Sequence, residues 1–499
     1  MSFFKRIGMI IAVAFISEMG VYAQDDKATV MQYIDDNATL YGDVAQQIWD
    51  WAEVGYLETQ SSNLLQQQLS TAGFEMTTGV AGIPTAFVAS WSAGTGGPIV
   101  GILAEYDALP GITQDRNPLR DAIDHKAAGH ACGHHLFGTG SVAAAIATKM
   151  WMQETGQIGE IRLYGTPAEE GGAGKVYMVR DGLFDDVDVV LHWHPSDSNS
   201  ADARSSLANK SAKFRFTGLS AHAAGAPHRG RSALDGVEAM NHMVNLMREH
   251  VPMETRIHYV ITSGGAAPNV VPDFSEVYYY VRHPDPAQVN EIFDRVVQTA
   301  EGAALGTDTE MEFEVIHGIY NVLPNISLQE AIYSNLTRVG GVEYSTEERQ
   351  FAETLRSALP PNAPPVEAAA IIRPMIVNER GGGGSTDVAD VSWAVATGGM
   401  RAATWVPGTS SHSWQAVAAG GTSIGNKGMI VAAKTLAMTA VDLMTNDALV
   451  KNAKNEHQNR LPAGWVYEPL LGDRPPPLDY RLPANLSLIH ISQPTRLLS

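Results

Sequence analysis

The stretch Gly129-His130-Ala131-Cys132-Gly133-His134-His135-Leu136-Phe137-Gly138-Thr139-Gly140 holds the one cysteine of the chain. Thiolate and imidazole are preferred ligands of zinc. Cys132 and His134 are two residues apart, so an extended backbone can point both at one metal ion. A buried free cysteine and a Cys-His nucleophile pair are alternative interpretations of the same residues. The small residues from 138 to 152 predict a helix that packs closely against a sheet.

Expected strands alternate with helices on both sides of this stretch. They cover residues 86–90, 98–103, 161–164 and 187–192. This alternation is typical of a doubly wound α/β domain, and we expect a mixed sheet. We assign residues 24–207 and 320–460 to this α/β domain.

A different order of elements lies between the two parts of the α/β domain. Strands are expected at 213–216, 258–263, 276–282 and 311–316, and helices at 233–249 and 286–304. The order β-α-β-β-α-β is that of a ferredoxin-like α+β domain. We assign residues 208–319 to an inserted domain, and 461–499 to an extended C-terminal tail. Residues 487–499 fit no expected element.

Composition and the N-terminus restrict the kind of protein. The 499 residues are 44% hydrophobic and 18% charged, as in soluble globular proteins. A formal net charge of -20 argues against nucleic acid or an anionic membrane as the partner. Residues 1–23 predict an export signal, with Lys5 and Arg6 before an apolar run and Val21-Tyr22-Ala23 as cleavage pattern. We expect a periplasmic or secreted protein, free of the membrane once the signal is cleaved.

Three more motifs carry chemistry. Glu169 and Glu170 directly follow an expected strand, so one can bind metal while the other moves protons. Either His192 or His194, at the end of another strand, could be a ligand, and we expect only one of them to bind. His412 lies in a loop of small residues. With Cys132 and His134, these ligands suit two metal ions about 3.5–4 Å apart and leave Glu169 as general base.

The chain resembles the zinc-dependent aminoacylase and carboxypeptidase superfamily, in the amidohydrolase branch that uses a cysteine ligand. Within that branch it is most similar to the aminobenzoyl-glutamate utilization protein B-like amidohydrolases. The similarity extends from about residue 33 to 444. The matching motifs are Gly129-His130-Ala131-Cys132-Gly133-His134, Pro167-Ala168-Glu169-Glu170-Gly171-Gly172, Trp193-His194-Pro195, Ala221-His222-Ala223-Ala224, Gly230-Arg231-Ser232-Ala233-Leu234-Asp235, Pro268-Asn269-Val270-Val271, Ser385-Thr386-Asp387-Val388 and His412-Ser413-Trp414-Gln415.

The resemblance implies a zinc-peptidase-like catalytic domain and a dimerisation role for the insertion. It implies metal ligands at Cys132, His134, Glu170, His194 and His412, with His192 as the alternative to His194. His194 is preferred because this subfamily is anchored on Trp-His-Pro. It also implies that Glu169 is the general base and later the acid.

Further roles follow from the same resemblance. His222 would reach the active site of the partner subunit and donate to the tetrahedral oxyanion. Asn269 and Arg282 match positions associated with the substrate carboxylate and the dimer contact. Backbone N–H groups at Gly383, Gly384 and Ser385 could bind the same carboxylate. Asp107 would orient a metal ligand without binding the metal.

The leading hypothesis is a dinuclear amidohydrolase that cleaves N-acyl amino acids, with aminobenzoyl-glutamate or a related acyl-glutamate as substrate. A metallo-dipeptidase or an aminoacylase of other specificity is the first alternative. A cysteine-nucleophile hydrolase and a non-catalytic binding homologue are the others. Zinc is expected because a thiolate is present, although manganese or cobalt could occupy the same ligands. We expect a homodimer, or a complex with a paralogous subunit.

Overall fold

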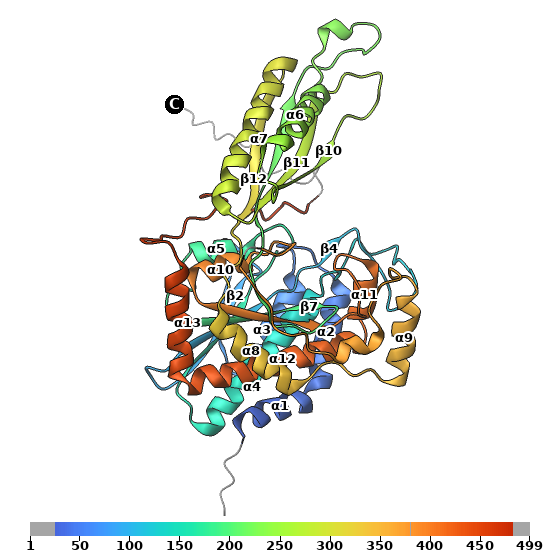
Figure 1. Cartoon of the computed structure of the whole chain (residues 1–499). Coiled ribbons are helices and arrows are strands. Elements are labelled where there is room, and N and C mark those ends of the chain that lie inside the picture. Colours follow the sequence, from blue (N-terminus) through green and yellow to red (C-terminus); the bar gives the residue numbers. More distant parts are fainter. Residues whose placement is uncertain (1–24, 380, 483–499) are drawn as a thin grey trace, which may run out of the picture.

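Figure 1 shows the computed structural model of the chain, which describes residues 25–379 and 381–482. Two bodies are visible, a large α/β body and a smaller one joined to it by the chain segments near residues 208 and 319. The expected export signal at 1–23 and the segment 487–499 lie outside the described residues.

A six-stranded mixed sheet forms the centre of the large body. Its order is β1-β2-β6-β3-β7-β14. The pairs β1–β2 and β2–β6 are antiparallel, whereas β6–β3, β3–β7 and β7–β14 are parallel. The strands are β1 (Glu75–Thr78), β2 (Phe87–Ala93), β3 (Ile99–Ala104), β6 (Gly159–Gly165), β7 (Val189–Ser196) and β14 (Thr397–Ala403). The mixed α/β sheet predicted from the sequence is confirmed.

Two small-residue helices, α4 (His134–Thr155) and α12 (Ser423–Thr445), pack against each other and against the sheet. Small side chains permit this approach, because a Cβ at Gly428 would lie 2.5 Å from the carbonyl oxygen of Ala403. Among the described helices α12 is long and apolar enough to cross a membrane, but 78% of its most apolar window is buried, so it serves as a core helix. The other helices of this body are α1 (Asp26–Asp36), α2 (Ala38–Trp51), α3 (Thr59–Thr71), α5 (Gly174–Arg180), α8 (Ile326–Val339), α9 (Thr346–Arg356), α10 (Val388–Ala394), α11 (Trp414–Gly420) and α13 (Asp447–Arg460).

The smaller body is a four-stranded antiparallel sheet in the order β10-β11-β9-β12. The strands are β9 (Ala208–Thr217), β10 (Arg256–Ser263), β11 (Phe274–His283) and β12 (Glu310–Ile319). Helices α6 (Ala233–Met247) and α7 (Pro286–Thr307) pack against each other and bury an apolar cluster against the sheet. The element order and strand order are those of a ferredoxin-like domain, as predicted.

The C-terminal segment does not leave the body after α13. Residues 461–482 run as turns and irregular chain along the junction of the two bodies. Arg474 pairs with Glu314 of β12 at 2.7 Å, and the hydroxyl of Tyr467 donates to Asp390 of α10 at 2.7 Å. Part of the tail therefore contacts both the large body and the inserted domain.

Candidate metal centre and active site

The candidate site residues converge because they follow parallel strands. Glu105 follows β3, Glu169 and Glu170 follow β6, His194 lies near the end of β7, and His412 lies in the loop after β14. Carboxyl ends of parallel strands meet at one edge of a sheet, where open α/β folds place their ligands. The parallel strands therefore bring these carboxylates and histidines, which are distant in the sequence, to one edge of the sheet.

Cys132 and His134 reach this edge from the turn that begins α4. Gly133 between them has a φ of +77°, and a Cβ there would lie 2.6 Å from Cβ of Pro195. A glycine is needed at this position for both reasons. The turn thus packs closely against the end of β7 and places Cys132 and His134 there.

Two sets of donor atoms share the thiol, and a third set consists of Glu105, His134 and Glu169. Cys132, His134 and His194 form one set, and Cys132, Glu170 and His412 form the other; within each set the donor atoms lie within 4.8 Å of one another. Sγ of Cys132 lies 3.4 Å from Nε2 of His194. This arrangement suits two ions with a shared bridging ligand.

The orientation of buried atoms tests whether cations fit there. Oε1 of Glu170 lies 3.1 Å from Nε2 of His412, and Nε2 of His134 lies 3.1 Å from Oε2 of Glu105. Neither Oε1 of Glu170 nor Nε2 of His134 has a partner in hydrogen-bond geometry within the described chain. Buried polar atoms are normally satisfied, so donors packed together without hydrogen bonds fit a ligand set around a cation.

The charge of the site also favours cations. Glu105, Asp107 and Asp387 are buried, and their one lysine neighbour, Lys175, is also buried. Burial, together with the nearby Glu170 carboxylate, raises the pKa of the Cys132 thiol. A thiol with a raised pKa is a poor nucleophile, whereas metal binding removes its proton. The environment therefore favours a ligand role for Cys132 over a nucleophile.

Asp107 orients two candidate ligands at once. Its Oδ1 accepts from Nδ1 of His134 at 2.8 Å, and its Oδ2 accepts from the main-chain N–H of Glu170 at 2.9 Å. The carboxylate fixes the His134 tautomer, so that Nε2 is the nitrogen left for another partner. This contact is the one that the resemblance implies for Asp107.

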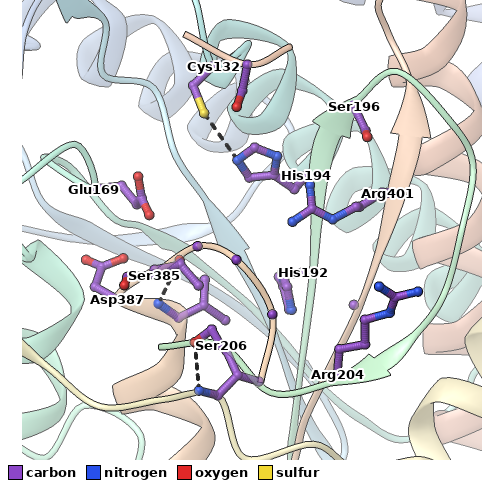
Figure 2. A pocket seen from close by; sticks show the side chains of 18 of the residues that line it. Cys132, Glu169, His192, His194, Ser196, Arg204, Ser206, Ser385, Asp387 and Arg401 are labelled. Atoms are coloured by element: carbon purple, nitrogen blue, oxygen red, sulfur yellow. Dashed lines mark hydrogen bonds between the residues drawn. The ribbon is translucent and has the colours of Figure 1, made fainter. Parts of the chain in front are cut away.

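Glu169 lies beside the two donor sets and faces the same pocket as Cys132 and His194 (Figure 2). Burial raises its pKa well above the ordinary range, and the Glu105 and Glu170 carboxylates add to the effect. A carboxyl group with a raised pKa can both take and return a proton near neutral pH. Its position and environment suit a general base.

The two histidines of β7 differ in their position relative to Cys132. Both point to the same face of the strand and both line the pocket, but His194 alone joins a donor set with Cys132. The ring of His192 instead lies over Gly399 of β14, where a Cβ would be 2.2 Å from Nε2. The structure thus brings His194 to the candidate centre and leaves His192 outside it.

A cavity of about 1180 Å³ opens from this centre toward the inserted domain. Gly383, Gly384, Ser385 and Arg282 line it. Nη1 of Arg282 donates to Oγ of Ser385 at 3.4 Å. The residues expected to bind a substrate carboxylate therefore share one cavity with the donor sets.

His222 and Asn269 do not lie in this cavity. Both are exposed, and their loops pair through the His222–Val270 bridge and the hydrogen bond from the N–H of Ala223 to the carbonyl of Asn269. Within one chain they are not brought together with the other predicted site residues.

Some side chains at the site were not assigned a role from the sequence. Nζ of Lys175 in α5 lies 2.7 Å from Glu105 and 2.7 Å from Asp387. A lone lysine in the small-residue run after Glu170 was the available signal. Tyr480 and Arg481, whose side chains donate to the main-chain carbonyl of Glu170, had no signal because the pattern of the tail is irregular.

Comparison with known proteins agrees with the geometry. Residues 207–308 match the family model of the peptidase dimerisation domain. The chain is 40% identical over 458 residues to one of the p-aminobenzoyl-glutamate hydrolase subunits of Escherichia coli (strain K12), across 86% of this chain and 95% of that protein. It is 29% identical over 453 residues to the Xaa-Arg dipeptidase of Mus musculus, across 87% and 93% of the two chains.

A solved structure shares the fold. A dinuclear metal-binding peptidase of the M20 family from Bacillus subtilis superposes with a TM-score of 0.53 at 16% identity, covering 82% of this chain and 99% of that one. The near-complete coverage at 40% identity confirms the family that the sequence motifs indicate. The chain belongs to the family of this p-aminobenzoyl-glutamate hydrolase component, among the M20 peptidases, and is a divalent-metal-dependent hydrolase of amide bonds.

Proposed function

We propose that this protein hydrolyses the amide bond of N-acyl amino acids, with aminobenzoyl-glutamate or a related acyl-glutamate as its substrate. One observation carries the proposal. The two donor sets share Cys132 and lie beside Glu169, at the end of a cavity large enough for such a molecule. The similarity to a component of a p-aminobenzoyl-glutamate hydrolase supports the choice of acyl-glutamate.

The residues divide the work of hydrolysis. Cys132, His134 and His194 would hold one divalent ion, and Cys132, Glu170 and His412 the other. When bound, the two ions lower the pKa of water and polarise the amide carbonyl. Glu169 takes a proton from the attacking water as the new C–O bond forms. It returns that proton to the amide nitrogen as the C–N bond breaks.

The substrate carboxylate would lie at Arg282 and Ser385. A guanidinium can bind a carboxylate through two hydrogen bonds, and the glycines before Ser385 leave main-chain N–H groups accessible. We propose zinc as the metal because the shared ligand is a thiolate, with manganese or cobalt as alternatives.

His222 would act on a second subunit. It is exposed and outside the cavity of its own chain, and it belongs to a domain that matches a dimerisation family. We propose that His222 enters the active site of a partner and donates to the oxyanion that forms at the attacked carbonyl. Asn269, in the loop hydrogen-bonded to that of His222, would move with it. The partner is a second copy of this chain or a paralogous subunit.

A dipeptidase or an aminoacylase of other specificity is the second candidate. Similarity to the Xaa-Arg dipeptidase favours it. It uses the same metal centre and differs in the amino acid released. A non-catalytic homologue is disfavoured, because each expected donor and the general base is present. We further propose, from the pattern of residues 1–23, that the protein is exported to the periplasm or secreted.

Release of amino acid from a panel of N-acyl amino acids and dipeptides tests the proposal. The expected result is metal-dependent release from aminobenzoyl-glutamate, lost in the Glu169→Gln variant and retained in Glu75→Gln, which alters an exposed carboxylate of β1. Preferred cleavage of peptides with C-terminal arginine would favour the dipeptidase. Full activity in chelator-treated protein would refute both.

A further inference from the structure

Three arginines that no role yet explains line the cavity. They are Arg204, Arg373 and Arg401. In Figure 2 Arg204 and Arg401 lie on one side of the pocket and Ser385 on the other, with His192 between them. The cavity thus has cationic side chains at two separate places, because Arg282 lies beside Ser385.

Main-chain hydrogen bonds hold this second group together. In the segment after β7, Ser200 forms a β-bridge with Arg401. The carbonyl of Asn199, in the same segment, accepts a hydrogen bond from the N–H of Arg373. Further on, β8 (Ala203–Arg204) pairs with β13 (Val377–Asn378). One short segment therefore brings the three arginines together from three separate parts of the chain.

The guanidinium of Arg401 has no ion pair or side-chain hydrogen bond among the described residues, and neither does that of Arg373. Arg204 is different, because its Nε lies 3.1 Å from Oδ2 of Asp202. The nearby Asp197 accepts from the N–H of Gly408 at 3.0 Å, and it forms no ion pair with the arginines. Arg373 and Arg401 are both exposed and line the cavity, so in a chain of net charge -20 they are available to pair with an anion bound there.

Of these three arginines, Arg401 lies on the strand that pairs with the strand of a candidate metal ligand. It is the register partner of His194 in the parallel pair of β14 and β7. A group bound at Arg401 thus lies one strand away from a candidate metal ligand, and a substrate in the cavity could reach both.

We propose that Arg401, supported by Arg373, binds the side-chain carboxylate of the amino acid that is released. This inference rests on the proposed function and makes it more specific. Arg282 and Ser385 bind the α-carboxylate, and Arg401 binds a second one. The preferred substrates are therefore acyl derivatives of glutamate. Neutral and cationic side chains bind less well, because they leave a guanidinium unpaired or repel it.

Three substrates distinguish the contribution of the α-carboxylate from that of the side-chain carboxylate. Aminobenzoyl-glutamate has both, aminobenzoyl-glutamine lacks the side-chain charge, and aminobenzoyl-isoglutamine lacks the α-charge. We expect the wild-type protein, with its metal bound, to prefer glutamate over glutamine by about ten- to a hundred-fold in kcat/KM, the range of a charge-assisted hydrogen bond. In Arg401→Gln the ratio of kcat/KM for aminobenzoyl-glutamate to that for aminobenzoyl-glutamine should fall to near unity. The ratio for aminobenzoyl-glutamate to aminobenzoyl-isoglutamine should stay as in the wild type.

Two further variants keep the test decisive. Arg401→Lys keeps the charge and should retain part of the preference, and Arg204→Gln removes an arginine that already has a partner and should change the ratio little. Activity on aminobenzoyl-glutamine reports whether each variant is folded with an intact metal centre. Equal kcat/KM for glutamate and glutamine in the wild type would overturn this inference and leave the amidohydrolase proposal standing. An equal loss on both substrates in Arg401→Gln would also overturn it, because Arg401 would then act on the metal centre. No cleavage of any of the three would overturn the proposed function itself.

Discussion

The hydroxyl of Tyr480 donates a hydrogen bond of 3.1 Å to the main-chain carbonyl of Glu170, although the two residues are 310 positions apart. Arg481 donates to the same carbonyl. The ring of Tyr480 also packs edge-on against Tyr56, with ring centroids 5.6 Å apart. Residues 480 and 481 of the C-terminal segment thus contact the backbone of a candidate metal ligand.

Removal of that contact should weaken metal binding. We compare a chain that ends at Leu482 with one that ends at Gly472. The shorter chain loses the hydrogen bonds to Glu170, so the metal concentration for half-maximal activity should rise by about ten- to a hundred-fold, as for other groups that orient ligands. Metal titration of the apoprotein measures it. The same metal requirement in both chains would show that the segment does not position Glu170.

Substitution of the two β7 histidines should have unequal effects. His194→Ala removes a donor 3.4 Å from the Cys132 thiol, whereas His192→Ala removes a ring that packs over Gly399. We expect His194→Ala to lose bound metal and activity, and His192→Ala to retain its metal. Metal content by elemental analysis, with activity alongside, distinguishes them. The reverse order would assign the ligand to His192.

Lys175 should be essential for stability. Its ammonium is buried and lies 2.7 Å from both Glu105 and Asp387. Removal of one partner from a buried pair leaves an uncompensated charge and costs about 3–5 kcal/mol. Lys175→Met should therefore lower the free energy of unfolding by about this amount, measured by urea denaturation. The double variant Lys175→Met/Asp387→Asn should recover part of the loss, and strict additivity of the two single effects would contradict this coupling.

Asp390 should make the protein less stable as the pH rises. Burial raises its pKa from the ordinary 3.8 to about 8, against hydrogen bonds from Tyr467 and Tyr320 that favour the charged form. Between pH 4 and 8 the folded state keeps a proton that the unfolded state has lost, so the stability contribution is present at low pH and is lost as pH rises through this range. Asp390→Asn removes the linkage. The loss of unfolding free energy from pH 5 to pH 8 should be smaller in the variant by at least about 1 kcal/mol, the value of roughly one pKa unit. An unchanged pH dependence would show that Asp390 ionises normally.

Two inactive variants should restore activity to each other if His222 acts on a partner subunit. Glu169→Gln lacks the base, and His222→Ala lacks the exposed donor. In a mixed dimer one site has Glu169 from one chain and His222 from the other. Activity measured after subunits are mixed and allowed to exchange should exceed that of either variant alone. Its absence, with exchange shown by sedimentation of differently labelled chains, would place His222 outside the reaction.

Much of the fold was predictable because it depends on local patterns. Alternating strands and helices predicted the mixed sheet, and the order β-α-β-β-α-β predicted the inserted domain. The positions of Glu170 and His412 were predictable because carboxyl ends of parallel strands meet at one edge, and Cys132 was predictable from its spacing to His134. The contact of the tail with Glu170 was not predictable, because irregular chain has no hydrophobic periodicity from which its position could be inferred.

The sequence by itself determined which chemical groups are present: a thiol, imidazoles and paired carboxylates in motifs at strand ends. Tertiary structure alone decided which of them meet. It placed His194 in a donor set with Cys132 and packed the ring of His192 over Gly399. It likewise placed Lys175 between Glu105 and Asp387. It also left Arg401 unpaired beside the cavity, within the part of the chain that the structure describes. These relationships depend on contacts between segments distant in the chain, and no spacing within one segment encodes them.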